Sequence, residues 1–392
     1  MWKLILSTVY LITTFISAEL RISEEDNFQD RSPRCESSFS LSFWDLPMYD
    51  SLMSLASGKA DLKVPVTVVW SAANLVDLRL ALALRDWEPA VSVLKRTCGQ
   101  SSNINCTYFS NPEYPAPYKG NGNPCTLSVW KCNKAICQVR LDFIDFNLGE
   151  PDAMGRCTDD FLLITGTGSN IKRICGMNTG QHVYLDFAGE APIELLIDVN
   201  SALATERKWN IKISQVECCK RAPVGCLMHY TASSGKVKSL NYAPTLSTAV
   251  QDPTAPGPGT RQLAELNYGV CVQMLPGYCS IEWTQSVGDK YSFTVSGDTE
   301  ALDPTVLGTA AASVTGEMCL TNFVIIPNPT VDELPSKTDR FCGNGFPTVV
   351  SSSKPFVMTV VTNPATSPTE VPETPDVGNR GFSLNYRQLP CV

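Results

Sequence analysis

Two stretches of this chain repeat one pattern of cysteines and apolar residues. Both open on Cys-x-x-Asp/Asn-Phe and three aliphatic residues and close on Arg-x-Cys-Gly, at residues 157–176 and 319–343. Each copy then ends with an aromatic residue nine positions before a cysteine, Trp209 before Cys218 and Phe382 before Cys391. An internal repeat indicates tandem units of one architecture. We therefore expect two cross-linked modules, and no catalytic set of residues is common to both.

The residues after Cys98 favour β-structure over helix. Short runs of alternating apolar residues, such as 139–146, 182–187 and 356–361, are separated by Gly, Pro, Asn and Asp. Many short strands with frequent turn signals are typical of β-sandwiches. Hydrophobic residues make up 43% of the chain and charged residues 18%, so a packed core is expected. The fold class predicted is all-β, with two tandem disulfide-bonded sandwiches.

The first residues predict secretion. Lys3 precedes an apolar run from Leu4 to Ile16, and the small residues Ser17 and Ala18 come before the charged Glu19. This order is typical of a signal peptide, here residues 1–18, and the run is too short for a membrane span. The mature chain is then extracellular, without a membrane span. The net charge of −8 argues against nucleic acid, which selects basic surfaces.

The segment 19–97 resists assignment. Its first part is polar, and residues 71–95 carry leucines that fit both a helix and an alternating strand. We treat it as an unassigned prefix, poorly ordered or partly helical, with a third domain as the alternative. The predicted organisation then continues with a first module at 98–218, a linker at 219–225 and a second module at 226–392.

Sixteen cysteines in a secreted chain are expected to form disulfides. Zinc is disfavoured because the chain has no C-x₂-C pair and only two histidines. Aligning the copies matches six cysteines of each. The favoured pairs are Cys157–Cys175 with Cys319–Cys342, Cys106–Cys132 with Cys226–Cys271, and Cys137–Cys218 with Cys279–Cys391. Local bridges Cys132–Cys137 and Cys271–Cys279 are the alternative. Cys98 and Cys125 lie outside the repeat and are expected to pair, which leaves Cys35 and Cys219 to bond each other or another chain.

The first copy resembles a CUB domain. Cys98-Gly followed by Asn111-Pro-Glu-Tyr-Pro-Ala-Pro-Tyr118 is similar to the family's opening Cys-Gly … Pro-x-Tyr-Pro-x-x-Tyr. The second copy lacks that opening but ends on Gly381-Phe-Ser-Leu-Asn-Tyr386, similar to the family's closing Gly-Phe-x-x-x-Tyr. Residues 98–392 together resemble secreted arthropod proteins with two divergent CUB domains. The resemblance implies jelly-roll-like sandwiches that act in extracellular binding.

Many CUB domains bind calcium through one Glu and two Asp, and the ion shapes an edge that receives a partner's Lys or Arg. That set is incomplete in the first copy. The three nearest candidates are Glu150, Asp160 and Asn200, and the family's Glu position itself falls on Gly149. We expect no cofactor, with calcium at these residues as the alternative. Without the ion, Asp159 and Asp160 are expected to be turn residues whose side chains cap local amides.

Catalytic patterns are missing. A serine protease needs a Ser nucleophile with an oriented His, and the chain has no Gly-Asp-Ser-Gly-Gly stretch. His182 and His229 do not form H-E-x-x-H. Asn105-Cys106-Thr107 is a glycosylation sequon, which predicts a modified Asn105.

Together these observations predict a secreted, non-enzymatic protein that binds an extracellular protein or glycan. One alternative is a structural matrix protein with interchain disulfides. Another is a non-catalytic regulator of an extracellular protease system. The tyrosines and prolines of residues 108–118 are a candidate contact edge, with packing over the core as the competing interpretation. The oligomeric state stays open.

Overall fold

A computed structural model describes residues 94–120, 122–171, 173–200, 205–248, 258–362 and 376–391. The predicted signal peptide and nearly all of the 19–97 prefix lie outside these residues. Ala90–Val392 form one unit. Its described residues are all-β, as predicted: the helices among them are the three-residue 3-10 turns η2 (Cys218–Lys220), η3 (Ala310–Ala312) and η4 (Gly316–Met318).

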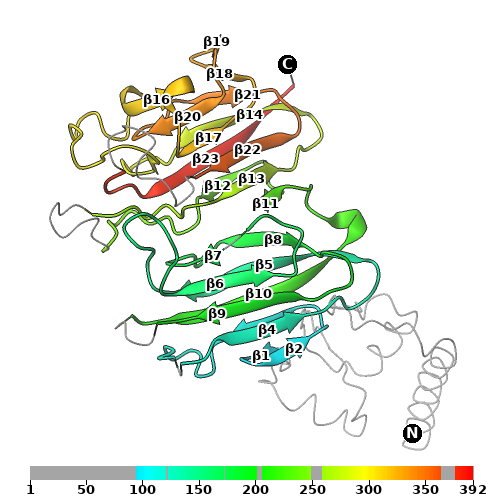
Figure 1. The fold of residues 1–392 in the computed structure, drawn as a ribbon. Helices are drawn as coiled ribbons and strands as arrows, with labels where there is room; N and C mark the ends of the chain where they lie inside the picture. Colours follow the sequence, from blue (N-terminus) through cyan, green and yellow to red (C-terminus); the bar gives the residue numbers. More distant parts are fainter. Residues whose placement is uncertain are drawn as a thin grey trace, which may run out of the picture. The chain divides into compact units, whose positions relative to one another are not determined.

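The first copy of the repeat forms two five-stranded sheets (Figure 1). In spatial order, one sheet contains β1 (Lys95–Arg96), β3 (Thr107–Ser110), β10 (Lys208–Glu217), β5 (Ile136–Asn147) and β8 (His182–Asp186). The other contains β2 (Gln100–Ser102), β4 (Cys125–Val129), β9 (Ile193–Asp198), β6 (Phe161–Thr165) and β7 (Arg173–Ile174). The first sheet thus begins three residues before Cys98, the position where the module was expected to start.

The second copy also forms two sheets. One contains β11 (Cys226–Tyr230), β13 (Asn267–Val272), β22 (Phe356–Val361), β17 (Phe323–Ile325), β20 (Arg340–Gly343) and β16 (Ser313–Thr315). The other contains β12 (Ser234–Lys238), β23 (Gly381–Pro390), β14 (Tyr278–Gln285), β21 (Val349–Ser351), β18 (Pro329–Val331) and β19 (Leu334–Pro335), and β15 (Phe293–Thr294) also pairs with β23.

Alternation of buried and exposed residues explains why these segments are strands. β9 and β22 both alternate strictly between buried and partly buried positions, so one face of each strand enters the core. The aromatic residues that open the closing strands, Trp209 and Phe382, are fully buried. Each anchors its strand in the core of its own copy, which is why the aromatic recurs at the same distance from the final cysteine.

Equivalent strands of the two copies pair in the same way. β10 runs antiparallel to β5, and β23 runs antiparallel to β14. A disulfide ties each pair: Cys137–Cys218 in the first copy and Cys279–Cys391 in the second, both with Cα atoms 4.8 Å apart. The last strand of each copy is therefore fastened to a strand from the middle of the same copy.

Four further disulfides also join the cysteines that the sequence favoured. They are Cys98–Cys125, Cys157–Cys175, Cys226–Cys271 and Cys319–Cys342. The local bridges Cys132–Cys137 and Cys271–Cys279 do not form, because Cys137, Cys271 and Cys279 all have other partners.

The predicted Cys106–Cys132 bridge is wrong. Cys132 is a free, partly exposed thiol, whereas Cys106 is disulfide-bonded. The amide of Cys132 donates to Oε1 of Gln215 at 2.8 Å, which fixes the turn after β4 without a covalent link. Cys219 is the other free thiol among the described residues and is exposed.

The repeated arginines have a structural role. The guanidinium of Arg173 lies 3.9 Å from the ring centre of Phe161 and donates to the carbonyl of Cys157. Arg340 does the same over Phe323, at 4.8 Å, and donates to the carbonyl of Cys319. Each arginine therefore covers the aromatic ring at the start of one strand and binds the backbone of the first cysteine of the adjacent disulfide. This accounts for the shared Arg-x-Cys-Gly pattern.

We expect the long bridge of the first copy to stabilise it more than the short one. Cys137–Cys218 spans 81 residues and Cys157–Cys175 spans 18. Closing a longer loop removes more entropy from the unfolded chain, about 4–5 against about 3 kcal/mol. Denaturant unfolding of Cys137→Ala/Cys218→Ala and Cys157→Ala/Cys175→Ala measures the difference. Equal losses, or a larger loss for the short bridge, contradict this ranking.

Candidate functional site

The predicted calcium residues do not converge on a metal position. Asp160 is fully buried, and its carboxylate accepts the Nε of Arg207 at 2.6 Å and the Nη2 at 3.2 Å. The same carboxylate accepts the amides of Gly149 at 2.8 Å and Asn200 at 2.9 Å. Both carboxylate oxygens are thus committed to donors. The amides that Asp160 accepts are 11 and 40 positions away, whereas the alternative interpretation expected local ones, and Asp160 also binds a buried cation.

Arg207 supplies the positive charge at this place. Besides the two bonds to Asp160, its Nη2 donates to the carbonyl of Asn200 at 2.5 Å and its Nη1 to that of Thr205 at 3.3 Å. Its side chain is 2% exposed. A calcium ion would meet a fixed guanidinium charge here, and its preferred oxygen ligands already accept N–H groups. The residues therefore do not fit calcium.

Gly149 leaves no room for the missing carboxylate. A Cβ atom at this position would lie 2.8 Å from Oδ2 of Asp160, closer than real Cβ contacts. A glutamate at 149 would therefore displace the buried Asp160. Within the ranges that the structure describes, no group of three or more His, Cys, Asp or Glu side chains is arranged to hold a metal.

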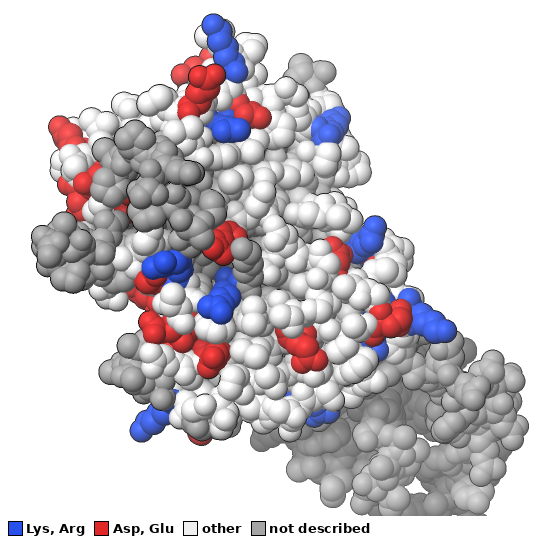
Figure 2. Space-filling view, viewed as in Figure 1, with Lys and Arg blue, Asp and Glu red and all other residues white. Residues whose placement is uncertain are grey.

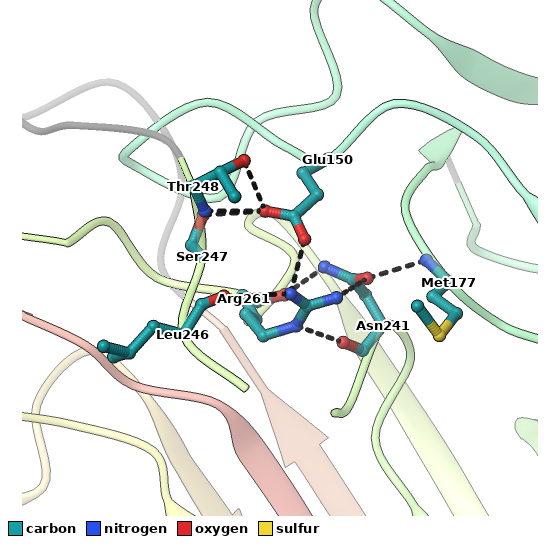
Figure 3. Close-up of polar contacts among 7 residues, drawn as sticks. All are labelled: Glu150, Met177, Asn241, Leu246, Ser247, Thr248 and Arg261. Atoms are coloured by element: carbon teal, nitrogen blue, oxygen red, sulfur yellow. Dashed lines mark hydrogen bonds and ion pairs between the residues drawn. The ribbon is translucent and has the colours of Figure 1, made fainter. Parts of the chain in front are cut away.

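Glu150 has a different function in the fold (Figure 3). Its Oε1 binds Nη1 of Arg261, and its Oε2 accepts the amide of Thr248 at 2.9 Å and the hydroxyl of Ser247 at 3.2 Å. Burial would raise the pKa of Glu150, but the Thr248 amide and the charge of Arg261 bring that pKa below its usual value. Glu150 belongs to the first copy and its three partners to the second, so the carboxylate joins the copies.

Asn241 completes this polar junction. Its Oδ1 accepts the amide of Met177 at 2.9 Å and Nη2 of Arg261 at 3.3 Å (Figure 3). The side-chain Nδ2 of Asn241 donates in turn to the backbone carbonyl of Arg261 at 2.8 Å. In this junction the buried donors of Arg261 and Asn241 are paired with acceptors. Such a paired network favours a single arrangement of the Glu150, Asn241 and Arg261 side chains.

The two histidines meet at another contact between the copies. Nε2 of His182 in β8 lies 3.0 Å from the carbonyl oxygen of His229 in β11. The His182 ring packs edge-on against Tyr184 and Tyr230. Burial and the charge of nearby Arg140 lower the pKa of His182 to about 4. This packed, neutral imidazole is a structural group in the described fold.

Two aromatic residues of the segment 108–118 pack inward. Phe109 and Tyr118 are buried, and both rings contact Trp209. The hydroxyl of Tyr114 donates to Asp145 at 2.9 Å. Phe109 and Tyr118 therefore pack over the first core, as the competing interpretation held. The three prolines of the candidate contact edge are exposed, and Tyr108 and Tyr114 are partly exposed.

A hollow that the sequence did not predict lies beside the first copy's edge strands. Its volume is about 460 Å³, and it is lined by Arg96, Ser101, Ser102, Asn103, Trp130 and Lys131. Trp130 is 46% exposed, unusual for a residue with so much apolar surface. An isolated Trp at the end of a strand carries no pattern that marks it as exposed, so only the structure reveals this set.

The predicted sequon adjoins this region. Oδ1 of Asn105 accepts the amides of Cys106 at 2.9 Å and Gln215 at 2.7 Å, and the side chain is partly exposed. Asn105 stays a predicted glycosylation site. Elsewhere, on the face that Figure 2 shows, charges of both signs are interspersed among uncharged residues.

A family model of the animal CUB domain matches residues 223–389, which identifies the second copy as a CUB domain. The match begins three residues before the predicted start of this module at 226. A comparison with curated protein sequences gives no match.

Solved structures with CUB domains are similar to this chain. The CUB1-EGF-CUB2 domains of rat MASP-1 share 14% identity over 73% of this chain and 99% of their own, with a TM-score of 0.24. The MASP-1 CUB2 domain bound to Ca²⁺ shares 19% over 30% and 98%, with a TM-score of 0.24. The extracellular region of zebrafish Gpr126/Adgrg6 shares 12% over 75% and 37%, with a TM-score of 0.25. At these scores the similarities assign no role to any residue here.

Arg207→Met should destabilise the protein strongly, because it leaves Asp160 buried without a counter-charge, at a cost of about 3–5 kcal/mol. Lys208→Met is the matched control, since its ion pair with Asp145 is partly exposed and contributes at most about 1 kcal/mol. Denaturant unfolding measures both losses of stability.

Calcium and EDTA should leave the unfolding temperature of the unmodified protein unchanged. A calcium-dependent rise of that temperature contradicts the assignment of Arg207 as the cation at this place.

Acid should destabilise the protein through His182. The folded pKa is about 4, below the usual 6.5, so the unfolded chain takes up a proton first as the pH falls. Stability is therefore lost between pH 6.5 and 4, by at most about 3 kcal/mol. Denaturant unfolding across this range should show a shallower loss in His182→Gln than in the unmodified protein. Parallel curves would show that His182 does not titrate in this way.

Proposed function

We propose that this protein is a secreted, non-enzymatic binding protein that recognises an extracellular protein or glycan through two tandem CUB modules. The main support for this proposal is the equivalence of the two copies. The second copy matches the CUB family, and the first copy has the same closing strand pair, the same disulfide across it and the same arginine–aromatic contact as the second. The first copy is therefore a second, divergent CUB module.

The disposition of reactive side chains supports a non-catalytic role. The chain has two histidines, and both lie at the contact between the copies. Among the described residues, no serine hydroxyl or cysteine thiol is hydrogen-bonded to either imidazole. A Ser–His or Cys–His nucleophile depends on that bond. The disulfides and the predicted signal peptide support an extracellular location, and no helix among the described residues is long and apolar enough to cross a membrane.

Binding in this proposal is independent of calcium. In the first copy Arg207 neutralises Asp160 and fixes the loops around Gly149 and Asn200. In the second copy the position equivalent to Asp160 is Asn322, whose side-chain amide donates to Asp376. Both loops are thus fastened by protein groups, so a partner would meet a preformed surface in the absence of the ion.

One observation favours a second candidate, a cross-linked matrix component. Cys219 is an exposed free thiol just after β10, and an unpaired thiol in a secreted protein is available for an interchain disulfide. Electrophoresis without reducing agent separates the two candidates: a disulfide-linked dimer that disappears in Cys219→Ser favours the matrix role, and a monomer excludes this cross-link.

The binding function predicts that the purified protein retains a partner from extracellular fluid equally well in calcium and in EDTA. The matched control is the same protein unfolded by reduction, because only the folded modules present the surface. Mass spectrometry identifies the retained molecules. Hydrolysis of peptide or glycoside substrates by the pure protein, or a lack of any partner retained above the reduced control, overturns the proposal.

A further inference from the structure

The hollow defined by Arg96, Ser101, Ser102, Asn103, Trp130 and Lys131 has no role in holding the copies together. Arg96 comes from β1, the two serines from β2, and Trp130 and Lys131 follow β4. Its volume of about 460 Å³ lies within the range of about 300–1,000 Å³ typical of small-ligand sites. That size suits one or two sugar rings.

Trp130 lines this hollow with a partly exposed side chain on a held backbone. Its amide donates to the carbonyl of Ser102 at 2.9 Å, and its carbonyl accepts Nε2 of Gln215 at 2.9 Å. The backbone is thereby held on both sides, while the side chain stays 46% exposed. A partly exposed indole offers a large contact area at small entropic cost and suits the C–H face of a sugar ring.

Two cations, Arg96 and Lys131, line the same hollow, although the whole chain has a net charge of −8. Arg96 donates to the carbonyls of Ser101 at 3.2 Å and Lys95 at 3.3 Å, and a guanidinium has five N–H donors, so further donors remain. Lys131 is only 15% exposed and binds Glu190 at 3.1 Å. Glu190 is 81% exposed, so a ligand acid can replace it at little cost.

We propose that this hollow binds an acidic saccharide, a sugar chain that carries carboxylate or sulfate groups. The indole would stack on a ring, the exposed polar side chains of Ser101 and Asn103 would bond hydroxyls, and Arg96 and Lys131 would hold the acid groups. An acidic peptide would use the two cations but would leave the indole and the polar side chains without matching partners. The inference rests on the proposed function and names the ligand class of one surface of the first module.

The test is direct titration of the full chain by calorimetry, after endoglycosidase treatment so that a sugar on Asn105 does not occupy the hollow. The probes are a heparin-derived tetrasaccharide, a hyaluronan tetrasaccharide, neutral chitotetraose and hexaglutamate. The first carries sulfate and carboxylate groups and the second only carboxylates. We expect one or both acidic saccharides to bind, and chitotetraose to bind more weakly by about tenfold or more, because it lacks the charge-assisted bonds.

Trp130→Ala should weaken saccharide binding by about tenfold, as loss of a central aromatic anchor does. Trp130→Phe should weaken that binding by at most about threefold. Arg96→Gln should weaken binding and reduce its dependence on salt. Lys236→Gln, an exposed lysine in β12 of the second copy, is the matched charge control and should change nothing. Thermal unfolding of each variant shows whether it is folded. If Trp130→Ala does not fold, the affinity of Trp130→Phe tests the role of the indole.

Three results overturn the inference: no saccharide binding up to about 1 mM, the weak limit for a specific site; saccharide binding that Trp130→Ala leaves unchanged in a folded variant; or hexaglutamate binding as tight as the saccharides, which points to a peptide site. A protein partner retained from extracellular fluid while the saccharides fail leaves the proposed function standing without this site. Saccharide binding without any retained protein supports the site and restricts the function to glycans.

Discussion

The antiparallel pairing of each copy's last strand with a strand from its middle is the constraint on which the structure depends. β10 with β5, and β23 with β14, bring together residues that are 81 and 112 positions apart at the disulfides. Such non-local pairing is entropically costly before the core forms. The buried aromatic at the start of each closing strand and the disulfide at its end fasten it at both ends. The sheets, the loops and the hollow are positioned by this frame.

Within that frame, electrostatics decides which carboxylates are available for binding. Asp160 accepts the amide of Gly149, the residue before Glu150, and each of the two carboxylates is bound by an arginine. Arg207 makes the first copy's edge independent of a metal, and Arg261 turns Glu150 into a contact between the copies. A buried carboxylate needs a counter-charge, and these two loops obtain it from the chain. Among the residues that the structure describes, the hollow is lined by two cations, Arg96 and Lys131, and by no carboxylate.

The sequence predicted the all-β class because alternation and turn residues are local signals. It predicted five of the six favoured repeat disulfides because the cysteines recur in the same order in both copies, although their separations differ, 81 against 112 and 18 against 23 residues. Cys106–Cys132 failed because its alignment with Cys226–Cys271 does not fix where the turn after β4 places Cys132. Arg207 escaped prediction since its partner Asp160 is 47 positions away, and no residue near either one marks the pair. The hollow depends on three strands of two sheets, β1, β2 and β4, which meet only in the folded sandwich. Burial and long-range charge pairing are properties of the fold, and a single sequence does not display them.

Disulfide mapping of the purified protein tests the central claim most directly. Free thiols are alkylated under denaturing conditions, and unreduced peptides are then identified by mass spectrometry. The account predicts peptides that link Cys137 to Cys218 and Cys279 to Cys391, with the alkyl label on Cys132 and Cys219. A peptide that links Cys132 to Cys137, or Cys271 to Cys279, would show that the closing strands are not fastened to the middle strands and would contradict the account.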